Sequence, residues 1–381
     1  MAHKATHSGL KEHNRRLVLR SVFTGAATSR AALAQHTGLT KPTISDIVSD
    51  LIDEGFLVET GHGASTESGG KRPRLLEFAP TARQIIGISV NEHHAFGVLA
   101  NLDGTIVLRH YAKLDGAHGA AILHIVQRTI NGLIAQLDAP LLCIGISTPG
   151  IVDAGSGLVR AAHTLGWRDL PLARDLEAIY ATPVYVGNST ELATRAQLAF
   201  GTAEEVCNLV TIVVNAAIEI GTTFGGATYH HSGDLGQLRP SLRVDQPLSA
   251  YLGWHAIAGR IDALRAEYPD TLVPIEGASY LHLRYGYAQD DPLSRIIYDE
   301  TAAYLGNIFA WTAGLLRPEQ IVLAGDIVDM GDALLELAIQ QASGRLPPEL
   351  LDTITFSLSE DPTLNVTGTL AFALHKELGV L

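Results

Sequence analysis

Residues 29–61 read SRAALAQHTGLTKPTISDIVSDLIDEGFLVETG, and their pattern predicts the structure of the N-terminal part of the chain. Ser29 can cap a helix that ends before Gly38, and Thr40 can cap the next helix, which tolerates Pro42 in its first turn. Two helices joined by a short turn that contains glycine form a helix-turn-helix. We therefore predict this motif here.

The helix that Thr40 begins has two different faces. Ile44, Ile47 and Leu51 recur at helical spacing, so one face belongs to a core. The other face is polar at its N-terminal end, where donors and acceptors can reach base edges in the major groove of DNA. We predict DNA contacts from Arg30 of the preceding helix and from Lys41, Thr43 and Ser45 of this one.

A basic loop follows the motif. Residues 56–59 and 75–78 are typical of paired strands, and the loop between them ends in Gly-Gly-Lys-Arg-Pro-Arg at 69–74. The negative potential of a narrow minor groove attracts inserted Arg and Lys. We predict a wing that uses Lys71, Arg72 and Arg74, although a solvated linker would have a similar composition.

Charge is divided unevenly along the chain. The formal net charge is −13, yet residues 1–83 carry eleven Lys and Arg against eight Asp and Glu, and the remainder carries 16 against 32. A basic segment attached to an acidic body fits a DNA-reading module. A chance fluctuation in a short segment would look the same. We predict a winged helix-turn-helix domain over residues 1–82.

Residues 83–381 alternate apolar strands with amphipathic helices, which indicates two linked α/β lobes with a ligand crevice between them. We expect lobe 1 over about 83–200 with a C-terminal helix at 365–381, and lobe 2 over about 201–364. The expected strands lie at 84–90, 96–101, 106–111, 141–147, 184–186, 209–214, 222–229 and 320–324, and expected helices include 120–137 and 191–200.

Composition excludes several classes of protein. No run of eighteen uncharged apolar residues exists, so we predict no membrane span and no membrane partner. We see no signal peptide and expect a cytoplasmic protein. Cys143 and Cys207 both lie in apolar, strand-like runs, so we expect both thiols to be reduced and buried.

Several stretches, in the same order along the chain, resemble the ROK family of repressors and sugar kinases. They are SGGKRPRLLEF at 68–78, IGISTPGIVD at 144–153, HTLGWRDLPL at 163–172, PVYVGNSTELATRAQLAFG at 183–201, GDLGQL at 233–238 and PEQIVLAGD at 318–326. The resemblance covers nearly the whole chain. It implies an α/β fold, with the winged helix-turn-helix followed by a two-lobed, actin-like (ribonuclease-H-like) ROK domain, usually in a homodimer or homotetramer.

The chain departs from the kinase pattern of that family. Kinases have a D-x-G-G-T turn where this chain has Ser89-Val90-Asn91-Glu92-His93-His94, so phosphate binding is disfavoured by charge and shape. The catalytic Asp of the family is replaced by Ser189, which cannot accept a proton near neutral pH without a base of its own. We predict that the chain is not an enzyme.

The metal site of the family is also missing. Gln237 replaces the expected His, and no Cys stands where the family has its zinc thiolates. We predict no metal and no cofactor.

Polar groups nevertheless remain at most positions that contact sugar in the family. The resemblance implies an effector site for a sugar or sugar derivative at His163, Asn188, Ser189, Asp234 and Gln237. The predicted function is a sequence-specific DNA-binding regulator, in the first place a repressor of carbohydrate-related genes that binds a double-stranded operator. Two alternatives stay open: a sugar kinase with an added head, and a DNA-binding dimer that responds to no ligand.

Overall fold

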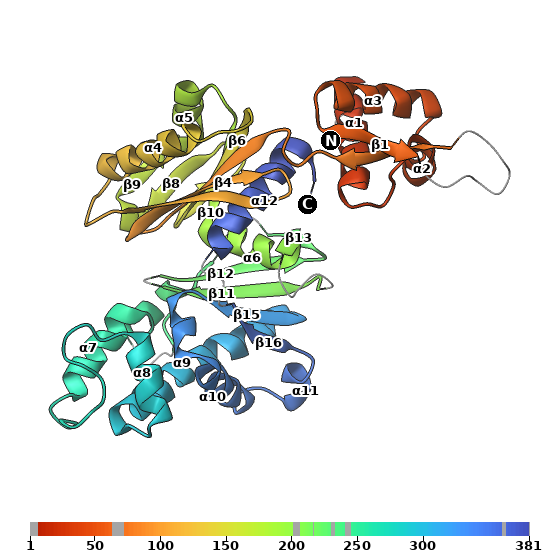
Figure 1. Cartoon of the computed structure of the whole chain (residues 1–381). Coiled ribbons are helices and arrows are strands. Elements are labelled where there is room, and N and C mark those ends of the chain that lie inside the picture. Colours follow the sequence, from red (N-terminus) through yellow and green to blue (C-terminus); the bar gives the residue numbers. More distant parts are fainter. Residues whose placement is uncertain are drawn as a thin grey trace. The chain divides into compact units, whose positions relative to one another are not determined.

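A computed structural model describes residues 7–62, 72–200, 206–215, 217–229, 233–240, 245–359 and 363–380. The chain divides into two compact units, Met1–Gly187 with Thr369–Leu381 and Asn188–Gly368. Figure 1 shows the elements of each unit along the chain. The domain and lobe boundaries that the sequence suggests stay a prediction.

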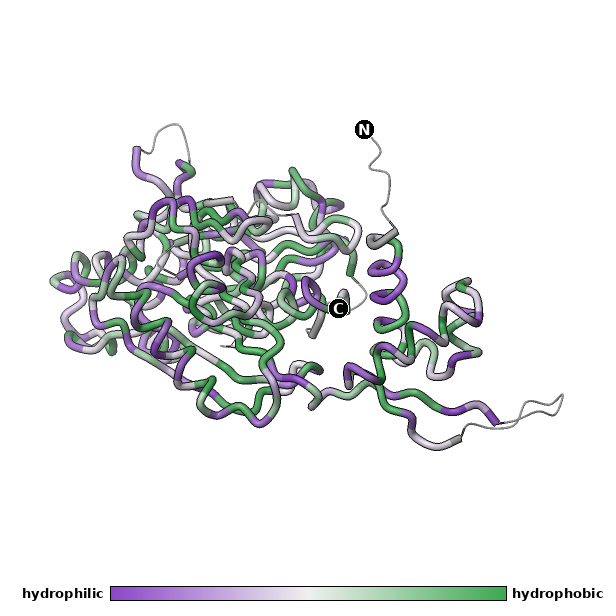
Figure 2. The backbone as a smooth tube through the Cα atoms, turned by 90° about the horizontal axis from the view of Figure 1, so that it is seen from above, coloured by the Kyte–Doolittle hydropathy of each residue, from purple (hydrophilic) through white to green (hydrophobic). Residues whose placement is uncertain are grey.

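The first unit begins with a helical head, α1 (His7–Phe23), α2 (Arg30–Thr37) and α3 (Lys41–Asp53). The first half of α1 is mostly hydrophilic and its second half mostly hydrophobic, which can be followed in Figure 2. Val18, Leu19 and Val22 of this helix are buried. They form the head core together with residues of the other helices and the hairpin, Leu33, Ile44, Ile47, Val48, Leu51, Leu57 and Leu76.

Side-chain caps define where α2 and α3 begin. The Ser29 hydroxyl accepts a hydrogen bond from the Ala32 amide at 3.2 Å, and the Thr40 hydroxyl accepts one from the Thr43 amide at 3.4 Å. Between these helices Gly38 has φ 71°, a left-handed conformation that favours glycine, and it ends α2. Both caps and the turn that the sequence predicts are confirmed.

A hairpin of β1 (Leu57–His62) and β2 (Arg74–Phe78) completes the head. The strands are antiparallel, with Leu57 opposite Phe78. Ser29, before α2, forms a further β-bridge to Leu75, so the start of α2 is fixed to the hairpin. The predicted pair of strands is confirmed, and the loop over 63–71 lies outside the described residues.

The remainder of the first unit is built on a sheet whose strand order is β10-β6-β3-β4-β5. Strands β3 and β6 are parallel, whereas β3–β4 and β4–β5 are antiparallel. The strands are β3 (Gln84–Val90), β4 (His94–Asn101), β5 (Ile106–Lys113), β6 (Leu141–Thr148) and β10 (Val184–Asn188).

Apolar helices cover this sheet. Ile122, Val126 and Ile130 of α4 share a core with the buried side chains of β3 and β6. A smaller sheet, β7-β8-β9, lies between β6 and α5 in the chain. These elements are α4 (Ala120–Ile134), β7 (Ile151–Asp153), β8 (Leu158–Ala162), η1 (His163–Leu165), β9 (Trp167–Leu170) and α5 (Leu172–Tyr180).

The second unit repeats the same kind of sheet, with strand order β13-β12-β11-β15-β16 and β14 paired to β12. Its strands are β11 (Leu209–Val214), β12 (Ile218–Phe224), β13 (Ala227–Thr228), β14 (Gly233–Asp234), β15 (Gln320–Ala324) and β16 (Thr355–Leu358). Strand β11 pairs antiparallel with β12 and parallel with β15. Every residue of β11 and β15 is buried, as expected for central strands.

Helices flank this second sheet, and the longest of them, α9, shares its core with β11 and β15. The helical elements of the unit are α6 (Ser189–Phe200), η2 (Leu235–Gln237), η3 (Leu248–Ala250), α7 (Trp254–Leu264), α8 (Tyr280–Ala288), α9 (Pro292–Leu316), η4 (Asp326–Met330), α10 (Asp332–Ser343) and α11 (Pro348–Leu351). The last helix, α12 (Leu364–Leu378), begins in the second unit and ends in the first.

Two sequence expectations are wrong. In place of the single strand expected at 222–229, the structure has two antiparallel strands. Strand β12 begins at Ile218, the chain turns at Gly225 and Gly226, and the short strand β13 pairs back with β12. Cys207 is exposed, because it precedes β11 instead of lying inside the sheet, whereas Cys143 is buried as expected.

Candidate nucleic-acid interface and effector residues

The leading end of α3 presents the polar residues that the sequence predicts. Lys41, Ser45 and Asp46 are exposed and Thr43 is half-buried. The opposite face, with Ile44 and its apolar neighbours, is buried in the head core. The helix thus keeps one face for packing and offers hydroxyl, ammonium and carboxylate groups on the other, which are the groups that read base edges.

The two threonines at the start of α3 are linked. The hydroxyls of Thr40 and Thr43 lie 2.9 Å apart, and either can be the donor. The Thr40 hydroxyl also accepts from the Thr43 amide, so the cap holds the Thr43 side chain near the helix start. The first turn of α3 is therefore held by hydrogen bonds within the chain itself.

Arg30 and Arg74 come from different elements and meet at one carboxylate. Arg30 begins α2, Arg74 begins β2, and the Nη1 atom of each donates a hydrogen bond to Glu59 of β1. These bonds, first that of Arg30 and then that of Arg74, hold the pKa of the Glu59 carboxyl below its ordinary value. The sequence prediction names the two arginines but not the acid that joins them.

The described part of the wing includes one more predicted cation. Arg72 is exposed. Lys71 lies outside the described residues. The structure therefore brings Arg30 and Arg74 together through Glu59, while the DNA contacts of all seven residues named from the sequence stay predictions.

Asn188 and Ser189 stand at the start of α6 in the second unit. Asn188 is 2% exposed, and its Oδ1 accepts hydrogen bonds from the amides of Thr190 at 2.8 Å and Glu191 at 3.1 Å. Asn188 is thus the cap of α6. Ser189 is half-buried in the first turn. The predicted effector residue Asn188 therefore also orders this helix.

The carboxylate of Glu219 lies beside the first turn of α6. The Thr190 hydroxyl donates to the Glu219 carboxylate at 2.6 Å, and Glu219 is the backbone partner of Asp234 across β12 and β14. The backbone of Asp234 therefore pairs with the residue whose side chain bonds to the first turn of α6. Gln237 is exposed in η2. His163 is exposed in η1 of the other unit, so the structure places four of the five predicted effector residues in one unit.

The turn that would bind phosphate in a kinase is closed by a side chain. Oδ1 of Asn91 accepts from the amides of His93 at 2.9 Å and His94 at 2.8 Å. An anion at this turn would need those amide hydrogens. Because Asn91 already accepts from both, the turn is satisfied internally.

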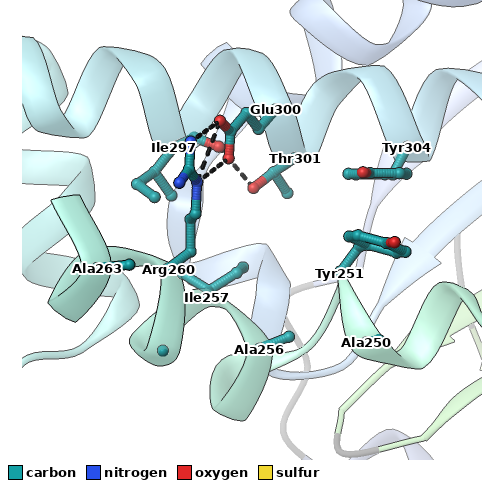
Figure 3. A pocket seen from close by; sticks show the side chains of 11 residues that line it. Ala250, Tyr251, Ala256, Ile257, Arg260, Ala263, Ile297, Glu300, Thr301 and Tyr304 are labelled. Atoms are coloured by element: carbon teal, nitrogen blue, oxygen red, sulfur yellow. Dashed lines mark hydrogen bonds and ion pairs between the residues drawn. The ribbon is translucent and has the colours of Figure 1, made fainter. Parts of the chain in front are cut away.

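A separate hollow of about 550 Å³ lies within the second unit, between α7 and α9. Figure 3 shows the rings of Tyr251 and Tyr304 on one side and the Arg260–Glu300 ion pair on the other. The rings are stacked, with centroids 4.6 Å apart, and the shortest distance of the ion pair is 2.7 Å. None of the predicted effector residues lines this hollow.

Among the residues that the structure describes, no group of three or more His, Cys, Asp and Glu side chains could hold a metal ion. The described helices also include none that is long and apolar enough to cross a membrane.

Comparison with known proteins identifies the family. The sequence pattern of the ROK family matches residues 85–364. The chain belongs to the ROK family. Its resemblance to that family in the sequence motifs is thereby confirmed.

Two curated relatives of this ROK chain are xylose repressors. That of Bacillus subtilis is 31% identical over 241 residues, which are 61% of this chain and 62% of the relative, less than two thirds of its length. That of Bacillus spizizenii is 30% identical over 353 residues, 91% of this chain and 90% of the relative.

A solved structure supports the fold over the whole chain. The crystal structure of a ROK family transcriptional regulator, described as a homologue of the Escherichia coli MLC protein, matches with a TM-score of 0.83 at 21% identity. The match covers 97% of this chain and 98% of that one. The predicted fold class, a winged helix-turn-helix with a two-lobed actin-like body, is confirmed.

Proposed function

We propose that this ROK chain is a sequence-specific DNA-binding transcription regulator, and that it represses sugar-related genes. The observation that carries the proposal is the exposed polar end of α3 on a helix whose other face is buried, next to a hairpin with exposed arginines. The names of two relatives, both xylose repressors, support the biological role.

In this account α3 lies in the major groove and the wing lies against the neighbouring minor groove. Thr43 and Ser45 contact base edges, while Lys41, Lys71 and Arg72 contact phosphates. Two heads, supplied by a homodimer or homotetramer, read two half-sites that are a helical turn or a multiple of it apart. The protein binds chromosomal DNA in the cytoplasm.

The chain is not a kinase in this account. Asn91 accepts from the turn amides that a phosphate would need, and Ser189 stands where the family's kinases have a catalytic Asp. A hydroxyl without its own base cannot take a proton from a sugar near neutral pH. The kinase-like body serves to sense a ligand and to assemble the oligomer.

The effector is a sugar or sugar derivative that binds at the start of α6. Ser189 supplies a hydroxyl group and Glu219 a carboxylate there, and hydroxyl-rich molecules need both donors and acceptors. Binding changes operator affinity only if the effector binds the DNA-bound and free states with different affinities.

Selection of genomic fragments by the purified full chain tests the function and yields the operator. With that duplex, Arg72→Ala should weaken binding and lower the slope of log K against log salt by about one unit per lost phosphate contact. Lys11→Ala is the matched control, because Lys11 pairs with Asp50 in the last turn of α3, away from its leading end. Equal slopes for wild type and Arg72→Ala would refute the wing contact.

Thermal denaturation with a panel of sugars, sugar phosphates and polyols tests the effector. A ligand at a hundred times its Kd adds roughly 2.7 kcal/mol to stability. A shift that Ser189→Ala abolishes supports the site at α6. No shift with any compound favours the alternative of a DNA-binding protein that responds to no ligand.

A further inference from the structure

One carboxylate in the head binds two cations that come from distant parts of the sequence. Oε1 of Glu59 accepts from Arg30, which precedes it by 29 residues, and Oε2 accepts from Arg74, which follows it by 15. The Glu59 side chain is 23% exposed, Arg30 34% and Arg74 62%. The acid thus lies beneath the two arginines, which reach further into solvent.

The bonds to Glu59 use only part of each guanidinium group. Both arginines donate to it through Nη1, whereas each group has five N–H donors on three nitrogen atoms. The Nε and Nη2 atoms make no bond to Glu59. A guanidinium held in this way can still donate to a phosphate oxygen, in an orientation that the acid fixes.

Fixing an arginine before DNA arrives has an energetic consequence. A long, freely rotating side chain loses rotamer freedom when it binds a phosphate, and this loss weakens binding. A side chain already held by the protein has lost that freedom on folding. This smaller loss of freedom strengthens binding only where a phosphate lies within reach of the fixed guanidinium group. Fixed arginines therefore favour a duplex that docks in one register.

The charge of Glu59 acts in the same direction. Nonspecific binding to DNA depends on the number of phosphates that the protein neutralises and little on sequence. Glu59 reduces the charge of the three-residue cluster from two positive charges to one. It therefore weakens attraction to every duplex, while the fixed arginines compensate on the duplex that fits.

We propose that Glu59 is a positioning residue for DNA discrimination: it holds Arg30 and Arg74 in place and so raises the ratio of operator affinity to affinity for unrelated duplex. This inference rests on the proposed function. Glu59 itself does not contact DNA in this account.

The test compares the full-length wild type with Glu59→Gln, Glu59→Asp and Glu77→Gln. Glu77 is the matched control, because it is exposed on the neighbouring strand and bonds to the Thr60 hydroxyl instead of an arginine. Anisotropy titrations over a range of KCl concentrations give the Kd for the selected operator duplex and for a scrambled duplex of equal length. Thermal denaturation of each variant checks that the head is folded.

Both glutamine variants should bind the scrambled duplex more tightly, since each removes one negative charge. Only Glu59→Gln should also lower the ratio of scrambled Kd to operator Kd, by roughly tenfold for two released side chains. Glu59→Asp keeps the charge but is too short to reach both arginines, so its ratio should fall between those of wild type and Glu59→Gln.

Two results would overturn the inference. The first is an equal fall in the ratio of scrambled Kd to operator Kd in Glu59→Gln and Glu77→Gln, which would mean that only the net charge of the head sets discrimination. The second is a wild-type ratio in Glu59→Asp, which would mean the same. If Glu59→Gln does not fold, Glu59→Asp decides alone. A wild type that prefers no duplex would refute the proposed function, which is a different failure.

Discussion

The Nη2 atom of Arg16, in the first helix of the head, donates a hydrogen bond of 3.2 Å to the backbone carbonyl of Lys376, near the end of α12. Helix α1 and the end of α12 therefore contact each other within the first unit. Gly379 follows α12 with φ 70°, and a Cβ added there would lie 2.8 Å from Cδ of Arg16. The end of α12 is also tied to the sheet, because the Tyr185 hydroxyl donates to Glu377.

Gly379→Ala should weaken this contact. The new Cβ meets the Arg16 side chain, and a non-glycine residue in the left-handed region costs about 1 kcal/mol or more. We expect a lower Tm and faster amide exchange in α1 and at the end of α12. Gly132→Ala is the control, since Gly132 lies in α4 with open space around its Cβ, and alanine there should stabilise by about 0.5–1 kcal/mol. A Gly379→Ala protein as stable as wild type would contradict the contact.

Asp291→Ala should destabilise the second unit by about 2–3 kcal/mol, as a lost cap that also leaves buried donors without a partner. Asp291 caps α9 and accepts from the Ser294 amide at 2.8 Å, the Ser294 hydroxyl at 2.7 Å and the Leu272 amide at 3.1 Å. Urea denaturation measures the change. Asp299→Ala, on the exposed face of the same helix, should stay within about 0.5 kcal/mol of wild type.

The same residue predicts a dependence on pH. Burial raises the pKa of Asp291, but the bonds from Ser294, Leu272 and Thr271 outweigh it and leave the pKa below its ordinary value. A lowered pKa in the folded state stabilises the protein above the unfolded value of about 3.9, and this stability is lost as the pH falls through the folded value. The Tm difference between wild type and Asp291→Ala should therefore shrink below about pH 4. A difference that is constant down to pH 2 would argue against a charged cap.

Ser189→Asp should not create a sugar kinase, although it restores the carboxylate of the family's kinases. The reason is the turn at Asn91, whose side chain accepts from both amides that a phosphate would need. A coupled assay of ADP formation across a sugar panel should give the background rate for both wild type and variant. Sugar-dependent turnover by either protein would revive the kinase alternative.

The two cysteines should differ in reactivity. Cys207 is exposed, whereas Cys143 is buried and its burial raises the pKa of the thiol. A thiol reagent should label about one cysteine per native chain and two after denaturation, and Cys207→Ser should abolish native labelling. Rapid labelling of both thiols in the native protein would show that β6 opens readily.

Local chemistry made the head predictable from sequence. Ser29 and Thr40 are residues that cap helices, and each accepts the amide hydrogen bond that a cap requires. The spacing of Ile44, Ile47 and Leu51 also fixed which face of α3 is buried, and all three are. Such features depend on residues within one or two helical turns of each other, so a sequence is enough.

Contacts between distant residues could not be predicted in this way. Nothing near Glu59 in the sequence indicates that it bonds to both Arg30 and Arg74, because only the pairing of β1 with β2 and the bridge from Ser29 to Leu75 bring these elements together. The expected burial of Cys207 is wrong for a related reason. Its apolar neighbours are typical of a strand, but Cys207 is exposed because β11 begins only at Leu209.

The most direct test of the central claim, that the head reads DNA sequence through α3, is one pair of affinities. The Kd of the full chain is measured by anisotropy for its selected duplex and for a scrambled duplex, in about 150 mM salt. We predict that the selected duplex binds at least 1,000-fold more tightly, roughly the lower limit for specific regulators. Equal affinity for the two duplexes would contradict the account.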